Sequence, residues 1–177
     1  MPLIRASTEA DVSAIAHIYA YHVLHGTGTF ETTPPTPDEI FVRRADVLVK
    51  GLPWLVVEEA GQVVGYAYGN WFKPRPAYRF SVEDSIYLDP QVIGKGLGRR
   101  LLADLMKALE QCGIRKVMAV IGDSANAGSI GLHAALGFQT VGVVKSCGWK
   151  FDRWLDIVLM EKSLGQADKC SPEEVMI

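Results

Sequence analysis

The chain has 177 residues, a formal net charge of -2 and a hydrophobic content of 49%. This size suits one globular domain with a substantial core. The balance of charges argues against general nucleic-acid binding, which needs a strongly basic face. No apolar run approaches the ~20 residues of a membrane span, so we expect neither a nucleic-acid nor a membrane partner.

The cysteines are odd in number, widely spaced and without zinc-like pairs: Cys112, Cys147 and Cys170. This pattern favours reduced thiols in a cytoplasmic protein. Residues 1–5 lack the apolar core of a signal peptide. The scattered histidines of the first predicted helix form no ligand set, so no metal is expected.

The first fifty residues predict a strand, two helices and a loop between the helices. Residues 3–6 can form the strand, and a capping box at Thr8 starts the first helix. A second capping box, at Thr36, starts the other helix. The loop, residues 26–35, contains one large apolar side chain, Phe30. Phe30 either anchors the loop to the core or forms a wall of a substrate pocket.

The next segment predicts a β-hairpin over residues 54–71 and a further strand over residues 80–88. Between them, residues 72–79 carry three cationic side chains and form either a solvated connection or a site for a carboxylate or phosphinate. Adjacent Glu83 and Asp84 lie inside the second strand, where a carboxylate is costly unless it has a partner or a role. In a regular strand they point to opposite faces, so they should not line one pocket unless a bulge intervenes.

Three alternating glycines, Gly94, Gly96 and Gly98, follow this strand and precede an apolar helix. Glycine lets the backbone approach a ligand closely, and a helix N-terminus suits a phosphate. Short Gly-x-Gly patterns are common, so the glycines alone leave a phosphate-bearing cofactor and a simple turn equally open. Residues 116–121 form the next strand, which makes a βαβ unit with two parallel strands.

The last part of the chain predicts one helix and two strands. Asn126 can cap the helix. Residues 139–146 and 153–160 are extended, and an aromatic and basic link, residues 147–152, joins them.

This order of elements resembles the GNAT superfamily of N-acetyltransferases. The family's pyrophosphate motif is Arg/Gln-x-x-Gly-x-Gly/Ala, and its places fall on Ile93, Gly96 and Gly98. Ile93 departs from the usual polar residue, which a clamp of main-chain amides does not need. The resemblance implies an α/β (α+β) fold: a mixed, mostly antiparallel twisted sheet of six or seven strands, flanked by helices, with a central parallel pair splayed at the acetyl-CoA site. We expect one domain over residues 1–164 and a polar, loose tail over residues 165–177.

More narrowly, the chain resembles the phosphinothricin and methionine sulfoximine N-acetyltransferase group. The matching segments are distributed over most of residues 4–164. They are residues 28–32, 75–79, 82–87, 132–137 and 148–156. The resemblance implies direct acetyl transfer from acetyl-CoA, a co-substrate, to the amino group of a small glutamate-like amino acid. Phosphinothricin, methionine sulfoximine and methionine sulfone are the expected acceptors. It also implies a homodimer and a role in detoxification or resistance.

The resemblance assigns catalytic roles to three residues. Similar enzymes place a carboxylate general base at Glu83, although a strand glutamate paired with Arg79 or Lys73 is the alternative. His133 stands where many members carry a tyrosine general acid, and it could protonate the thiolate, relay a proton, hold the substrate or simply pack against the sheet. The backbone N–H of Leu88 would meet the oxyanion. The implied acetyl-CoA-binding residues are Ile86, Tyr87, Leu88, Ile93, Gly94, Lys95, Gly96, Leu97, Gly98, Arg99 and Asn126.

The acceptor site is expected to combine an apolar wall with groups that bind anions, and in a dimer Phe30 or Trp149 could act across the interface. Two alternatives are N-acetylation of a protein N-terminus or another small amine, and a non-catalytic acyl-CoA-binding domain. Cations in the site argue against the first, and the presence of both proposed catalytic side chains argues against the second. The expected substrate-binding residues are Phe30, Arg75, Tyr78, Glu83, His133 and Lys150.

Overall fold

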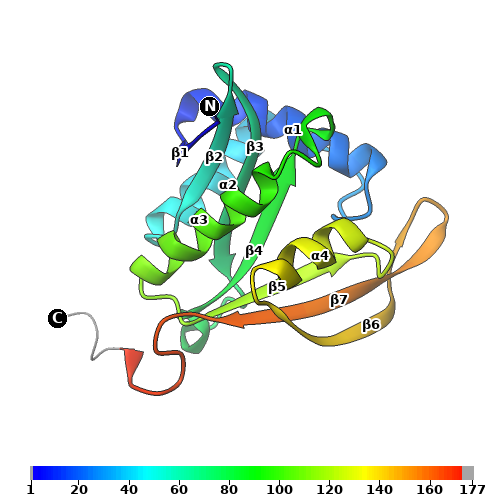
Figure 1. Cartoon of the computed structure of the whole chain (residues 1–177). Coiled ribbons are helices and arrows are strands. Elements are labelled where there is room, and N and C mark those ends of the chain that lie inside the picture. The colour runs from blue at the N-terminus through cyan, green and yellow to red at the C-terminus, as the bar shows by residue number, and fades with distance from the viewer. Residues whose placement is uncertain (1, 173–177) are drawn as a thin grey trace.

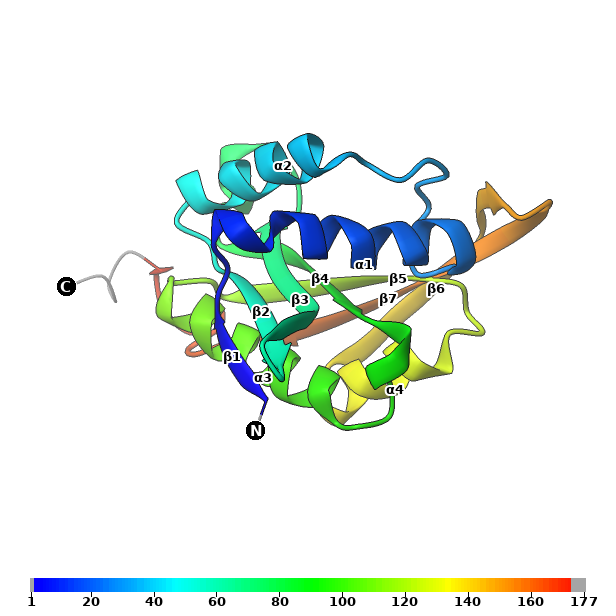
Figure 2. The same cartoon turned by 90° about the horizontal axis from the view of Figure 1, so that it is seen from above.

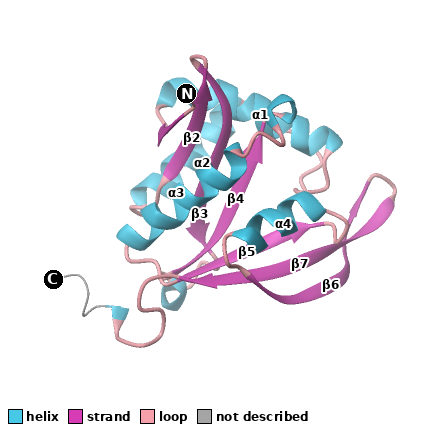
Figure 3. Ribbon diagram, viewed as in Figure 1, coloured by secondary structure: helices cyan, strands magenta, loops and turns pink. Residues whose placement is uncertain are grey.

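One seven-stranded sheet organises the computed structural model, which describes residues 2–172 (Figures 1 and 3). The strand order is β1-β2-β3-β4-β5-β7-β6. Only β4 and β5 pair in parallel, and the other neighbours are antiparallel. This mixed topology confirms the expected fold class. The strands are β1 (Leu3–Ala6), β2 (Trp54–Glu59), β3 (Gln62–Trp71), β4 (Ser81–Leu88), β5 (Lys116–Gly122), β6 (Gln139–Lys150) and β7 (Arg153–Ser163).

Helices cover both faces of the sheet, with α1 and α2 on one face and α3 and α4 on the other (Figure 2). The second helix begins at the predicted capping box: Thr36 N–H donates to Glu39 Oε2 at 2.7 Å, and Glu39 N–H donates to Thr36 Oγ1 at 3.2 Å. Such reciprocal bonds satisfy amides that the helix leaves without partners. The helices are α1 (Val12–His25), α2 (Pro37–Val49), α3 (Leu97–Gln111) and α4 (Ala127–Ala135).

The core has parts on both faces of the sheet, and α3 supplies much of the part on its own face. Leu101, Leu105 and Leu109 are each 0% exposed and follow the helical period of one face. Burial of a leucine side chain contributes about 1.5–3 kcal/mol, so this stripe fixes α3 firmly. The glycine turn that precedes α3 is thereby held beside the end of β4.

The sheet is split between β4 and β5. These strands pair at only three positions, Ser81–Glu83 with Lys116–Met118. Beyond them β5 continues along β7, whereas β4 continues along β3 as far as Leu88. Figure 1 shows the two strands diverging. One edge of residues 84–88 is therefore left without a neighbouring strand, as the expected splayed pair requires.

The hairpin of β6 and β7 is longer than the sequence predicted. Residues 147–152 were expected to form a link, but most of them continue β6, and Trp149 pairs with Trp154. The reversal occurs at Phe151 and Asp152, whose φ angles are 53° and 54°. Two consecutive positive φ values are typical of a type I′ hairpin turn, for which Asn-Gly or Asp-Gly is the usual sequence signal. Phe-Asp lacks that signal, so the turn could not be located in advance.

The segment after β7 begins in turns. Ala167 N–H donates to Leu164 O at 2.9 Å, and Leu164 itself is 4% exposed. The boundary between a domain over residues 1–164 and a tail remains a prediction, and residues 173–177 lie outside the described residues. Within residues 2–172, no helix is long and apolar enough to cross a membrane.

Candidate active site

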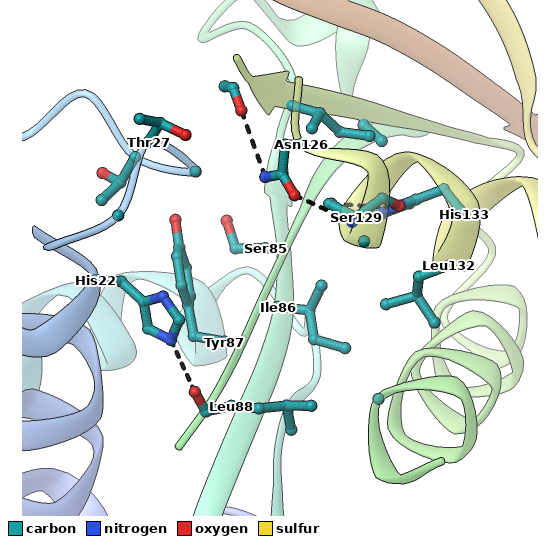
Figure 4. Close-up of a pocket in the computed structure, with 18 of the residues that line it drawn as sticks. His22, Thr27, Ser85, Ile86, Tyr87, Leu88, Asn126, Ser129, Leu132 and His133 are labelled. Carbon is teal, nitrogen blue, oxygen red and sulfur yellow. Dashed lines mark hydrogen bonds between the residues drawn. The ribbon is translucent and has the colours of Figure 1, made fainter. Parts of the chain in front are cut away.

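A cavity of about 1080 Å³ opens where β4 and β5 separate. Side chains from both faces of the sheet line it, because the split continues through the sheet. Figure 4 shows His22 and Thr27 on one side of β4 and Leu132 and His133 on the other. The cavity thus joins the glycine turn, the unpaired edge of β4, the loop after α1 and the start of α4.

Glu83 and Asp84 both line this cavity. We expected that they could not share a pocket without a bulge, and this expectation was wrong. The register between β3 and β4 is regular, so the two side chains do point to opposite faces. They reach one cavity because the neighbouring strand β5 leaves β4 immediately after Glu83.

The carboxyl group of Glu83 is suited to accept a proton. Burial raises its pKa first, the charge of neighbouring Asp84 raises it further, and the ammonium of Lys73 partly offsets both effects. A carboxyl pKa shifted toward neutrality makes a better base at physiological pH. The alternative of a simple ion pair with Lys73 is thereby weakened, since Lys73 is the smallest of these influences.

His133 is buried, and both of its ring nitrogens have partners within the protein. Its side chain is 3% exposed, Nε2 lies 3.0 Å from Asp84 Oδ2 and Nδ1 lies 2.7 Å from Ser129 O. The ring also stands edge-on to Phe138, with centroids 4.9 Å apart. Both ring nitrogens therefore contact protein atoms, although His133 is among the residues that line the cavity.

The end of β4 presents main-chain groups to the split. Asp89 N–H donates to Val64 O of β3 at 2.9 Å. Since main-chain groups alternate along a strand, the N–H and C=O of Leu88 and Ile86 face away from β3. His22 Nε2 lies 2.7 Å from Leu88 O, and a carbonyl can only accept, so His22 donates this bond (Figure 4). Tyr87 projects instead toward α1, where its ring meets Tyr19 with centroids 4.9 Å apart.

The glycine turn contains two kinds of glycine. Gly94 and Gly96 have φ angles of 86° and 77°, and a Cβ on either would meet no atom within 4 Å. These two line the cavity and have open space before them. Gly98 also lines it, but a Cβ there would lie 3.2 Å from Leu88 Cδ1, so it serves close packing as well. The first amides of α3, which begins at Leu97, have no partner within the helix.

Some of the other residues predicted to bind acetyl-CoA at this turn line the cavity, and others do not. Ile93 and Arg99 line the cavity, and Ile93 is 62% exposed. Lys95 instead forms an ion pair with Glu59 at 3.3 Å and is absent from the lining. Leu97 is 3% exposed and belongs to the core. Of the two cations that could compensate for Ile93, the structure places Arg99 in the cavity.

Asn126 caps α4 at the cavity wall. Its Oδ1 accepts from Ser129 N–H at 3.2 Å, and its Nδ2 donates to Gly122 O at 3.4 Å. One amide N–H of Asn126 is not used by these bonds. This geometry keeps Asn126 within reach of a ligand in the cavity (Figure 4).

The loop after α1 forms a wall of the cavity, and Lys150 holds it in place. Lys150 is 4% exposed, and its Nζ donates to Gly26 O and Thr29 O at 2.8 Å each. Phe30 lines the cavity and packs so closely on Gly148 that a Cβ there would overlap its ring. Lys150 was predicted to bind the substrate anion, and the structure turns its ammonium into the loop instead, outside the cavity lining.

Arg75 and Tyr78 lie on an exposed 3₁₀ turn, Pro76–Tyr78, that precedes β4. Neither lines the cavity. Sequence reasoning also missed two lining residues with specific partners, Asp84 and His22. Their partners, His133 and Leu88 O, are 49 and 66 residues away in the chain, so no local pattern could have identified the pairs.

Comparison with known proteins identifies the family. A model described as "Acetyltransferase (GNAT) domain" matches residues 4–159. The sheet split beside a glycine turn is what the resemblance to this family had implied. The chain therefore belongs to the GNAT acetyltransferases.

Individual relatives narrow the resemblance. The chain is 48% identical over 170 residues to phosphinothricin N-acetyltransferase of Alcaligenes faecalis, covering 96% of this chain and 86% of that protein. It is 40% identical to L-methionine sulfoximine/L-methionine sulfone acetyltransferase of Salmonella typhimurium, covering 92% and 95%. A crystal structure of a phosphinothricin acetyltransferase from Sinorhizobium meliloti in complex with AcCoA superposes with a TM-score of 0.94 and 42% identity, covering 98% and 94%.

Proposed function

We propose that this protein is an acetyl-CoA-dependent N-acetyltransferase that acts on the amino group of a small glutamate-like amino acid. Phosphinothricin, methionine sulfoximine and methionine sulfone are the proposed acceptors. The observation that carries the proposal is the cavity at the sheet split, which joins the glycine turn to the half-buried residue Glu83. The names of the most similar relatives support this choice of acceptor.

The residues present fit acetyl-CoA, which supplies the thioester acyl group for the reaction. The open backbone at Gly94 and Gly96, with the first amides of α3, suits a pyrophosphate, and Arg99 adds a positive charge. Main-chain groups of Ile86 and Leu88 face the split and can pair with an amide-containing arm as an added strand would. The free N–H of Asn126 serves the same arm.

Glu83 acts as the general base. Amino groups are largely protonated at neutral pH, and a carboxylate with a raised pKa can remove a proton so that the nitrogen attacks the thioester carbonyl. The N–H of Leu88, which points into the split, donates to the developing oxyanion. The C–N bond forms, the C–S bond breaks, and the departing thiolate receives its proton from solvent.

The acceptor enters between the loop after α1 and Glu83. Phe30 provides an apolar wall that is already fixed within its own subunit by Gly148. We propose that Arg75 and Tyr78, which lie outside the cavity lining but close before β4 in the chain, receive the anionic side chain of the acceptor. Lys150 is left out of this role, because the loop carbonyls already occupy its ammonium.

We further propose that the protein forms a homodimer through the hairpin of β6 and β7. Strand β6 is at the edge of the sheet, and unprotected edges favour association. A patch of exposed apolar side chains supports this choice of surface. A detoxifying role in the cytoplasm follows from the proposed acceptors and from the cysteine pattern. The patch residues are Val141, Val143, Val144, Trp149, Phe151 and Trp154.

A thiol-release assay tests the activity. Acetyl-CoA is offered with phosphinothricin, methionine sulfoximine, methionine sulfone, a panel of polyamines and a peptide with a free N-terminus. We expect turnover with the three amino-acid analogues and much less with the other amines. If the peptide or a polyamine is acetylated and none of the analogues is, the proposed acceptor is wrong. Hydrolysis in the absence of any acceptor is the background control.

A further inference from the structure

The pair formed by Asp84 and His133 lies at the point where the sheet divides. Glu83 is the last residue of β4 that pairs with β5, so Asp84 is the first residue beyond the pairing. His133 lies on α4, which follows β5 in the chain. The contact between Asp84 Oδ2 and His133 Nε2, at 3.0 Å, therefore joins the two sides of the split.

The hydrogen-bond partners of His133 leave no ring nitrogen for a ligand. Ser129 O can only accept, so Nδ1 carries a hydrogen. The other nitrogen shares a proton with Asp84, and the pair is neutral overall whichever atom holds it. In both arrangements the imidazole offers neither a lone pair nor an N–H to the cavity.

Burial keeps this shared proton from exchanging readily with solvent. The side chains of His133 and Asp84 are 3% and 1% exposed. Asp84 raises the pKa of His133 against the opposing effect of burial. Asp84 Oδ1 is buried without a hydrogen-bond partner among the described residues, so the carboxylate depends on His133 for its neutralisation.

We propose that Asp84 is a positioning residue of the acetyl-transfer site, which braces the split through His133 and excludes His133 from proton transfer to the thiolate. The proposal rests on the proposed function for its catalytic part, although the brace itself concerns only the width of the cavity. The width of the cavity matters because the amide-containing arm of acetyl-CoA must fit between β4 and β5 beyond the point where these strands stop pairing.

The charge of Asp84 has a second consequence for Glu83. The charged and titratable groups around Glu83 are Asp84 on β4, Lys73 before the 3₁₀ turn, and Tyr68 on β3. Around His133, Asp84 is the charged neighbour, and Lys162 of β7 binds the carbonyl of Leu136 at the end of α4. Since Asp84 shares a proton with His133 and the pair is neutral overall, the effect of Asp84 on Glu83 is weaker than that of a lone carboxylate, and Asp84→Asn leaves the pair neutral as well.

Asp84→Asn is the variant that keeps the shape of the brace. The amide N–H of Asn can donate to Nε2 while Nδ1–H still donates to Ser129 O, which makes His133 neutral. We expect the dissociation constant for coenzyme A, measured by calorimetry, to stay within threefold of the wild-type value. The acid limb of the pH–rate profile should stay near its wild-type position, because the pair at residues 84 and 133 is neutral in both proteins. Asp84→Ala removes the brace and should weaken coenzyme A binding at least tenfold.

¹⁵N NMR of protein labelled at histidine detects directly which ring nitrogens of His133 are protonated. In the wild-type protein Nδ1 of His133 should be protonated and Nε2 should share its proton with Asp84, so the ring should titrate at higher pH than a free histidine. In Asp84→Asn only Nδ1 should keep its proton at neutral pH. Titration of wild-type His133 near the value of a free histidine would overturn the proposal, as would wild-type affinity for coenzyme A in folded Asp84→Ala. If Asp84→Ala fails to fold, the NMR spectra and Asp84→Asn still decide. Coenzyme A binding and the spectra need no acceptor, so they stand even if no amino-acid analogue is turned over.

Discussion

Replacement of Lys150 by methionine separates two explanations for the same residue. As a loop clamp, Lys150 donates two hydrogen bonds of 2.8 Å to Gly26 O and Thr29 O. As a substrate ligand, which the sequence suggested, it would bind an anion in the cavity. Methionine keeps the apolar volume of the side chain and removes the charge. The two explanations therefore predict different effects on stability.

The magnitude follows from the two bonds. A hydrogen bond from a charged donor contributes about 1.5–3 kcal/mol net, so two contribute about 3–6 kcal/mol. Burial lowers the pKa of Lys150, and release of this ammonium from its buried position offsets part of the loss. We expect the free energy of unfolding to fall by about 3 kcal/mol, and the Tm by about 6–12 °C for a domain of this size.

The assay is urea unfolding of Lys150→Met followed by circular dichroism, beside Lys145→Met as the matched control. Lys145 is on the same strand, its side chain is 73% exposed, and it forms a surface ion pair with Asp156, so its replacement should lower the free energy of unfolding by less than about 1 kcal/mol. In the Lys150 variant the KM values of both substrates should rise, because the loop forms a wall of the cavity. Wild-type stability with a rise in the KM of the amino acid alone would refute the clamp.

Three further changes test the site. Glu83→Gln should lower the rate about 10²–10⁴-fold at neutral pH, and much less at high pH where the amine loses its own proton. Because the pKa of Glu83 is raised in the folded protein, ionisation of Glu83 lowers the stability as pH rises from the unfolded-state pKa through the folded-state pKa. The variant should therefore melt at a slightly higher temperature at neutral pH. Gly96→Ala adds a methyl group at a φ of 77° facing open space, so calorimetry should show a free energy of unfolding lower by roughly 1 kcal/mol. The KM for acetyl-CoA should rise, and an unchanged KM would remove Gly96 from the cofactor site. His22→Phe should weaken acetyl-CoA binding about fivefold through loss of the bond to Leu88 O, worth about 1 kcal/mol, and His22→Gln, which keeps an N–H donor, should restore it; equal affinity in both variants would contradict this role.

The sequence predicted most helices and strands because their signals are local. The capping box at Thr36 and the tight turn between β2 and β3 each depend on residues within one turn of chain. The reversal at Phe151 and Asp152 was placed only within the six-residue link over 147–152, because a positive φ at Phe151 has no sequence signal. Even an unlikely pair of residues is held there by the strand pairing on both sides.

The site was harder to predict because its partners are distant. Glu83 lies in the cavity lining, but Asp84 was assigned to another environment by a rule that assumes an intact sheet. The split that brings them to one cavity depends on where β5 stops pairing, which is set by packing across the molecule. In the same way, Lys150 looked like an anion ligand because its partners, two main-chain carbonyls, carry no sequence signature.

Two glycines nevertheless carried a readable signal. Gly122 ends β5 and Gly148 lies inside β6, where glycine weakens a strand and often marks a close approach of another segment. A Cβ at Gly122 would overlap the carbonyl of Thr27, and one at Gly148 would overlap the ring of Phe30. Both glycines therefore contact the loop after α1, and together they determine where this cavity wall packs against the sheet. The loop thus meets the sheet at two strand glycines, whereas Gly65 and Gly69 admit leucine side chains instead and Gly142 faces open space.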